Sequence, residues 1–250
     1  MQSSKIDKGD WRLQTTTHLA EDWVSPWTGA TSPKGTRITV VSIIQLTKKK
    51  RLTVPIPNAT ASMLNASVNA YEKARTLRMN SGIDKSLKDD VAFKSEQDAL
   101  DYIERMIEAI VLAFSAIEAF ANESIPNDFI FTRHKRSEVI LEAANKQTIE
   151  RDLSTDEKLS QVLPKVLDCQ SPKSSQCWES YKQLKKVRDR IIHMKTEDRK
   201  SSGPDLDTVW KAIVLSPAPH EAAKNIDDYF VKKMPTKPKW HERFSNREIT

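Results

Sequence analysis

Glycine is scarce in this chain, with only 5 residues in 250. Glycine-rich phosphate loops and dinucleotide-binding folds need several glycines at fixed spacing, because their backbones approach the phosphates closely. Nucleotide-dependent chemistry on either motif is therefore disfavoured. Cysteine is scarcer still. Cys169 and Cys177 lie eight residues apart without a second pair, so no zinc site of ordinary spacing is expected, and we expect no metal and no cofactor.

Long apolar runs are also missing. No stretch approaches the roughly 18 to 20 continuous apolar residues of a membrane span, and the first residues lack an apolar signal region. We therefore expect a cytoplasmic protein without a membrane partner. Apolar residues still make up 38% of the chain, enough for a core, and 40 Lys+Arg against 34 Asp+Glu give a net charge of +6. That surplus favours anionic partners such as nucleic acid.

The two ends of the chain differ in character from its middle. Residues 1–57 predict an irregular segment, packed by Trp11, Trp23 and Trp27, followed by a β-hairpin. The hairpin strands are two runs rich in β-branched residues, 37–46 and 52–56, joined by a lysine-rich turn at 47–50. The turn is read as solvated, with phosphate contact as the alternative. Residues 233–250, with two prolines and scattered basic residues, predict a basic mobile tail.

Helical patterning dominates residues 58–232, with a core at 95–232. Asn58 or Thr60 is placed to cap a helix that runs to about residue 79, and Ser95 with Asp98 resembles the cap of a long helix ending near residue 124. Apolar residues recur at spacings of three and four along that helix. Shorter helices are predicted at 137–146, 155–168, 175–195 and 217–232. The fold class is mostly α, a bundle of four to five helices with a small N-terminal β-hairpin.

The hexapeptide from Arg188 to His193 has the pattern Arg-x4-His. It combines a fixed cation with the one side chain that titrates near neutral pH, which suits metal-free cleavage of a phosphodiester. It lies on a predicted amphipathic helix whose polar face is basic. That face can track phosphates, or it can be a solvated surface bearing an ordinary histidine. Its candidate substrate-binding residues are Lys185, Lys186, Arg190 and Lys195.

The long helix carries a second polar pattern. Ser115, Glu118 and Asn122 are spaced three and four apart and share one face. Glu118 stands about 40° from Phe114 in projection, at the edge of the apolar stripe, where a carboxylate is costly without a partner. An Arg or His from another helix is the natural partner, and an ordinary structural ion pair would meet the same requirement.

The order Ser-x-x-Glu-x-x-x-Asn and then Arg-Asp-x-x-x-His resembles the HEPN superfamily of higher eukaryote and prokaryote nucleotide-binding domains, over about residues 95–232. The resemblance implies a helical bundle, a homodimer that brings two motifs into one composite active site, and metal-independent endoribonuclease activity. Many members act as toxins or in antiviral defence, which implies RNA as substrate and a possible antitoxin or defence-system partner. Others have lost catalysis, so the alternative is a helical module that binds RNA, a nucleotide or a partner protein.

The motif positions correspond to Arg188, Asp189 and His193, with Glu118 as a further catalytic candidate and Ser115 and Asn122 as substrate-binding candidates. His193 is expected to act as general acid or base, and Arg188 to neutralise the scissile phosphate. Asp189 lies one turn before His193, where it can orient the imidazole. The products are a 2′,3′-cyclic phosphate and a 5′-hydroxyl.

Arg188 and His193 stand about 140° apart on a regular helix. The helix is therefore distorted near the motif, or the long Arg side chain reaches round, or each residue works with its counterpart across a dimer axis.

Overall fold

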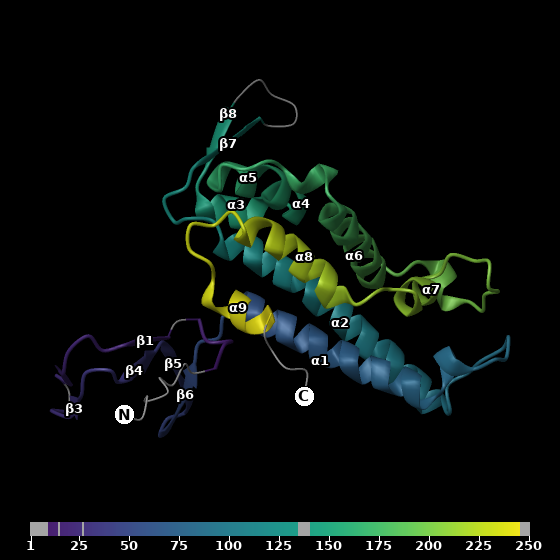
Figure 1. Cartoon of the computed structure of the whole chain (residues 1–250), viewed down its shortest axis with the longest axis horizontal. Coiled ribbons are helices and arrows are strands. Elements are labelled where there is room, and N and C mark those ends of the chain that lie inside the picture. The colour runs from purple at the N-terminus through teal and green to yellow at the C-terminus, as the bar shows by residue number, and fades with distance from the viewer. Residues whose placement is uncertain (1–9, 15, 27, 135–140, 246–250) are drawn as a thin grey trace, which may run out of the picture. The chain divides into compact units, whose positions relative to one another are not determined.

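The computed structural model describes residues 10–14, 16–26, 28–134 and 141–245. Its contacts divide the chain into two compact units, residues 1–62 with 238–250 and residues 63–237 (Figure 1). Most of the structure is helical, with a few short strands in small sheets, which confirms the mostly α-helical class predicted from the sequence.

The first unit contains three short antiparallel strand pairs among its described residues. β1 (Thr16–His18) pairs with β4 (Arg37–Thr39), β2 (Trp23–Val24) with β3 (Thr31–Ser32), and β5 (Val41–Thr47) with β6 (Lys50–Pro55). The β5–β6 pair is the hairpin that the sequence predicts, and Lys50 begins its second strand. Residues 37–39, expected in the same strand, pair instead with β1, because the chain leaves the ladder at Val40.

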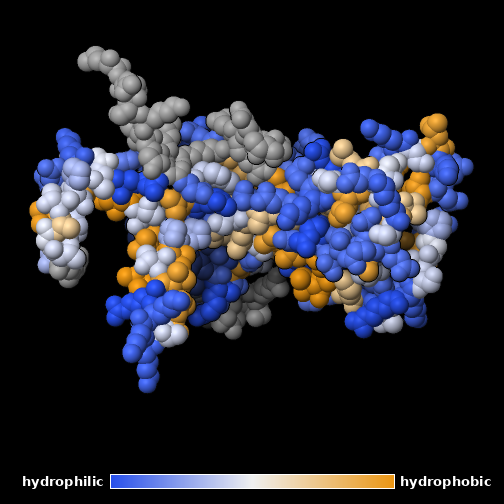
Figure 2. Space-filling view, turned by 90° about the horizontal axis from the view of Figure 1, so that it is seen from below, coloured by the Kyte–Doolittle hydropathy of each residue, from blue (hydrophilic) through white to orange (hydrophobic). Residues whose placement is uncertain are grey.

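The β5–β6 hairpin is largely uncovered within its unit. Ile43 and Ile44, which point to opposite faces, are 65% and 44% exposed, and apolar surface is visible around the hairpin at the left of Figure 2. Trp23 is 44% exposed, so the expectation that it packs the N-terminal segment is wrong. Trp27 lies outside the described residues. Trp11 follows the expectation, with its ring centroid 5.6 Å from that of Phe244.

That contact belongs to a helix the sequence did not predict, α9 (Lys239–Ser245). Trp240 and Phe244 are spaced four apart and are both buried, so the helix has an anchoring apolar face. The expected mobile tail is therefore wrong for residues 239–245, because two aromatic residues in a basic, proline-bearing segment suffice to anchor it.

The second unit is built around α2 (Glu96–Glu123). Ser95 caps this helix by accepting a hydrogen bond from the Asp98 N–H at 3.1 Å, as predicted. The preceding helix, α1 (Ala59–Asn80), begins at the predicted cap, where Asn58 Oδ1 accepts from the Ala61 N–H at 2.8 Å. Both starts were readable from the sequence because a cap is a local interaction.

Helix α2 contributes the largest share of the core. Its buried face packs against α6 (Gln176–Ile192), α7 (Val209–Val214) and α8 (Pro219–Val231). On another side α1 lies alongside α2, where Ser67 Oγ donates to the Ala109 carbonyl at 2.8 Å (Figure 1). Phe120 of α2 meets Phe230 of α8 with ring centroids 6.4 Å apart.

Residues 141–144, predicted as part of a helix at 137–146, form a strand instead. β7 (Phe131–His134) pairs with β8 (Leu141–Ala144), and α3 (Lys146–Asp152) follows. Asn145 sets the start of α3: its side chain accepts from the Thr148 N–H at 3.0 Å, so the helix begins after this residue. The prediction is wrong for residues 141–145, and residues 137–140 lie outside the described part of the chain.

The segment predicted as a helix at 155–168 contains three consecutive helical pieces. They are α4 (Thr155–Glu157), a π-helical turn (Lys158–Val162) and α5 (Leu163–Val166), introduced by a capping box between Ser154 and Glu157. Single 3₁₀ turns lie at Ile83–Lys85, Pro172–Ser174 and Thr196–Arg199. The short helix α7 was not predicted, whereas α8 lies within the predicted range 217–232.

Candidate functional site

Helix α6 carries the Arg-x4-His motif and ends inside it. Ile192 is its last residue, and His193 has left the helical conformation at φ −117° and ψ 53°, although its N–H still donates to the Asp189 carbonyl at 2.9 Å. The predicted helix end at residue 195 is therefore too late. His193 is thus the C-cap residue, and the chain leaves the helical path at the end of the motif.

Arg188 joins α6 to α2. Its guanidinium carbon lies 3.6 Å from the centroid of the Phe114 ring, and this ring stacks in turn on Tyr181 at 6.1 Å. The Arg188 side chain is 25% exposed. A cation over an aromatic face is attracted by the ring quadrupole. The two helices with the candidate motifs therefore meet at the Arg188–Phe114 contact, and Ser115, the residue after Phe114, is half-buried.

Asp189 does not orient the imidazole as expected. Its carboxylate binds Lys185 Nζ at 2.6 Å and Arg188 Nη1 at 3.0 Å. Within the described residues, no hydrogen bond reaches the exposed His193 ring. Each cation binds a different oxygen of this carboxylate, so the side-chain contacts of Asp189 in the described structure are with Lys185 and Arg188 and not with the histidine.

Glu118 is exposed, and its partner is neither Arg nor His. Thr155 Oγ1 donates to Glu118 Oε1 at 3.4 Å, because α4 and the π-helical turn pack against this part of α2. Lys158, the buried first residue of the π-helical turn, donates to the Glu150 carbonyl at 2.8 Å. Burial lowers the pKa of Lys158, and the nearby charges of Glu118 and Glu150 only partly oppose this shift.

The remaining predicted residues are dispersed. Asn122 is half-buried, with an Oδ1 that has no hydrogen-bond partner in the described structure. Lys186 is exposed and lines a cavity on another side of α6. The structure thus brings Arg188, Asp189 and Lys185 together, and leaves Glu118 and Lys186 apart from them.

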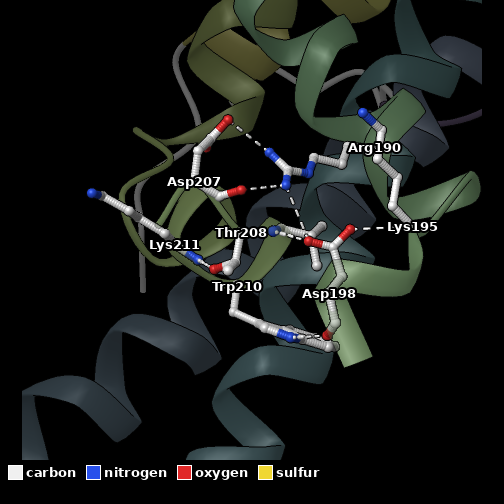
Figure 3. Close-up of polar contacts among 8 residues, drawn as sticks. Arg190, Lys195, Asp198, Asp207, Thr208, Trp210 and Lys211 are labelled. Carbon is white, nitrogen blue, oxygen red and sulfur yellow. Dashed lines mark hydrogen bonds and ion pairs between the residues drawn. The ribbon is translucent and has the colours of Figure 1, made fainter. Parts of the chain in front are cut away.

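Arg190 and Lys195 belong to a structural network (Figure 3). Arg190 binds Asp198 at 3.1 Å and Asp207 at 2.9 Å. The buried Asp198 carboxylate also accepts the backbone N–H groups of Val209 at 2.8 Å and Lys195 at 3.1 Å. These hydrogen bonds lower the pKa of Asp198, and the bond from the Val209 N–H has the largest effect. The guanidinium of Arg190 is therefore occupied in holding the segment 195–209 to α6, which the sequence did not indicate.

The hydrogen bond made by Tyr181, a residue near Arg188, was not predicted from the sequence. Tyr181 is 0% exposed, and its hydroxyl donates to Asp156, which also binds Lys182 at 2.7 Å. Burial raises the pKa of Tyr181. Burial alone would raise the pKa of Asp156, but the hydrogen bonds from Lys182 and Tyr181 outweigh it and lower that pKa. The Ser154-x-x-Glu157 box marks this helix start in the sequence, yet nothing there links Asp156 to α6.

Asp227 of α8 is a second unexpected group. It is 1% exposed, and neither carboxyl oxygen has a hydrogen-bond partner among the described residues. Burial, with the neighbouring charges of Asp228 and Glu123, raises its pKa well above the usual value. The adjacent pair Asp227-Asp228 reads as solvated in the sequence, so this burial could not be foreseen.

In the described part of the chain, no group of three or more His, Cys, Asp or Glu side chains is placed to hold a metal ion. Nor does any helix there combine the length and apolar character needed to cross a membrane.

No family model, curated protein or solved structure matches this chain. The HEPN resemblance therefore stays a prediction that rests on the motifs and their placement.

Proposed function

We propose that this protein is a metal-independent endoribonuclease of the HEPN type, cleaving RNA to 2′,3′-cyclic phosphate and 5′-hydroxyl ends in a toxin or antiviral defence role. One observation carries the proposal: Arg188 of α6 packs against Phe114 of α2, so the Arg-x4-His helix meets the helix with the Ser-x-x-Glu-x-x-x-Asn face. The bundle of α1, α2, α6 and α8 is consistent with the four to five helices of that family.

The chemistry assigns one role to each residue of the pair. His193 is exposed at the end of α6, where its imidazole can exchange a proton with the ribose 2′-hydroxyl or the leaving 5′-oxygen. Arg188 is a quarter exposed and offers donors to the charge that accumulates on the phosphate. Lys185 and Asp189 set the charge around Arg188, with one carboxylate shared between two cations.

Asp189 favours a second candidate function as well. Its pairing with Arg188 and Lys185 compensates part of the positive charge, and it leaves the histidine ring without the orienting bond that catalysis would use. These contacts suit a non-catalytic helical module that binds RNA, a nucleotide or a partner protein.

RNA cleavage in EDTA separates the two functions. Purified wild type, His193→Ala and Arg188→Ala are incubated with total RNA, and the ends are tested for 2′,3′-cyclic phosphate. His18→Ala and Arg75→Ala remove exposed residues of the same types elsewhere and serve as matched controls. The nuclease proposal expects cleavage by wild type and both controls only. Cleavage that persists in His193→Ala and Arg188→Ala ends the assignment, and none by folded wild type favours the binding module.

Mixing the two inactive variants tests the composite site. If one protomer supplies Arg188 and its partner His193, random heterodimers should recover roughly a quarter of wild-type activity, since half the dimers are mixed and one of their two sites is complete. If both residues act from one protomer, each mixed dimer lacks a complete site and no activity returns.

A further inference from the structure

A cavity of about 470 Å³ lies between α6, α8 and the segment that joins α7 to α8. Its walls are mainly apolar and come from α6, α7, α8 and the segment between α7 and α8: Leu184, Val187, Ala212, Leu215, Ala218 and Ala222. Small-ligand sites are typically concave, apolar and between about 300 and 1,000 Å³, with a few polar groups that orient the ligand. Both the size and the lining of this cavity are in that class.

The polar groups at the cavity differ in how fully their charges are compensated. Arg190 is paired with Asp198 and Asp207, whereas Glu221 lies 3.5 Å from His220 Nε2, which carries a charge only when protonated. Lys186 is exposed, and no carboxylate pairs with it within the described structure. The cation available to a ligand is therefore Lys186, which favours an anionic group on the ligand.

Helix α8 adds to the positive potential. It begins at Pro219, its N-cap residue Ala218 makes no side-chain capping bond, and both residues line the cavity. The N-terminal end of a helix carries the positive pole of its dipole. The positive potential at this helix end therefore adds to that of the Lys186 ammonium group.

The cavity wall is held in place by the network around Arg190 (Figure 3). Arg190 and Asp207 line the cavity, and their ion pair at 2.9 Å joins α6 to the chain that enters α7. Asp198 fixes the start of α7 through the Val209 N–H. A wall held in this way needs little ordering when a ligand binds, which reduces the entropic cost of binding.

We propose that this cavity binds a small organic anion, with its apolar body between α6 and α8 and its anionic group at Lys186. Lys186 and Arg190 each lie two residues from Arg188, about 200° around the helix, so the cavity is on the face of α6 opposite the Arg188–Phe114 contact. Binding there is independent of RNA cleavage and is tested without RNA.

Isothermal titration calorimetry with two matched probes tests the proposal. 2-Naphthalenesulfonate and 2-naphthylmethylamine share an apolar body and differ in the sign of their charge. We expect one site per chain and tighter binding of the sulfonate. Lys186→Gln should weaken sulfonate binding about two- to fivefold, the range for an exposed charge pair. Lys232→Gln removes an exposed lysine at the other end of α8 and should leave the affinity unchanged.

Two variants that fill the cavity complete the test. Ala218→Phe occupies the apolar space, and Asn225→Trp covers the mouth from an exposed position that folding tolerates more easily. Both should abolish binding of the two probes. The proposal is overturned if the two probes bind with equal affinity, if neither binds, or if they bind at several weak sites. It is also overturned if the affinity is unchanged in folded Ala218→Phe and Asn225→Trp.

Discussion

The guanidinium carbon of Arg188 lies over the Phe114 ring, 3.6 Å from its centroid, so a charged side chain packs at the interface between α6 and α2. The ion-pair partner of Arg188 is Asp189, on the same helix. The Nε of Arg188 has no hydrogen-bond partner in the described structure. The aromatic face is thus the contact through which Arg188 holds the two helices together.

A double-mutant cycle measures this contact. Phe114→Leu keeps an apolar side chain at the buried position but removes the ring, and Arg188→Met keeps the length but removes the charge. Urea unfolding of the four proteins should give a coupling free energy of about 0.5–1 kcal/mol, the range for a partly exposed cation–π pair. Additive losses within about 0.3 kcal/mol would mean that the contact contributes only packing.

Tyr181→Phe tests the buried hydroxyl that donates to Asp156. At pH 7 the variant should lose about 1–2 kcal/mol of unfolding free energy in urea, because the bond is to a charged group. The pKa of Asp156 is lowered in the fold, so its stabilising effect is present above the usual value of 3.8 and is lost as pH falls through the folded value. The difference between wild type and variant should therefore shrink below about pH 4.

Tyr229→Phe is the matched control for that experiment. Its hydroxyl donates to the Gln170 carbonyl at 2.9 Å in an exposed position, and its loss should cost about 0.5 kcal/mol or less. Equal losses in the two variants would contradict a special role for the Tyr181–Asp156 bond.

Asp227→Asn should stabilise the protein at alkaline pH. The pKa of buried Asp227 is raised, so its favourable contribution is complete below the usual value of 3.8 and is lost as pH rises through the folded value. Urea unfolding at pH 8 should favour the variant by about 1–3 kcal/mol, the cost of an unpaired buried group. The curves should converge near pH 4, where the wild-type carboxyl is protonated as well.

Asp228→Asn provides the comparison for Asp227. This neighbouring carboxylate binds Lys224 at 2.6 Å, so its neutral variant should gain nothing at pH 8. The free energy of unfolding of wild type should fall between pH 4 and pH 8 relative to that of Asp227→Asn. If it does not fall, Asp227 is solvated.

Local chemistry decided which parts of the structure could be predicted. The caps at Asn58 and Ser95 fix helix starts through hydrogen bonds between residues three apart, so the sequence alone placed the starts of α1 and α2. The strand at 141–144 and helix α9 depend on what covers Phe131 and Trp240, both of which are buried. Such burial by distant segments leaves no local signal.

The candidate site divides in the same way. Arg188 and Phe114 were each visible as part of a pattern, but their contact requires the packing of two helices. Glu118 was assigned an Arg or His partner because its position beside the apolar stripe suggested burial. Instead α4 supplies Thr155, and Glu118 stays exposed.

Asp198→Asn should loosen the segment between α6 and α7. Asp198 accepts the backbone N–H groups of Lys195 and Val209 and the Arg190 guanidinium, and an amide cannot match three donors as a carboxylate does. Hydrogen exchange read by mass spectrometry should show amides of residues 195–209 exchanging at least about tenfold faster, with α2 unchanged. Asp207→Asn is the control: it is 78% exposed, and the Asp207 carbonyl keeps its own bond to Arg190. Exchange accelerated equally by both variants, or spread over α2, would contradict a local role for Asp198.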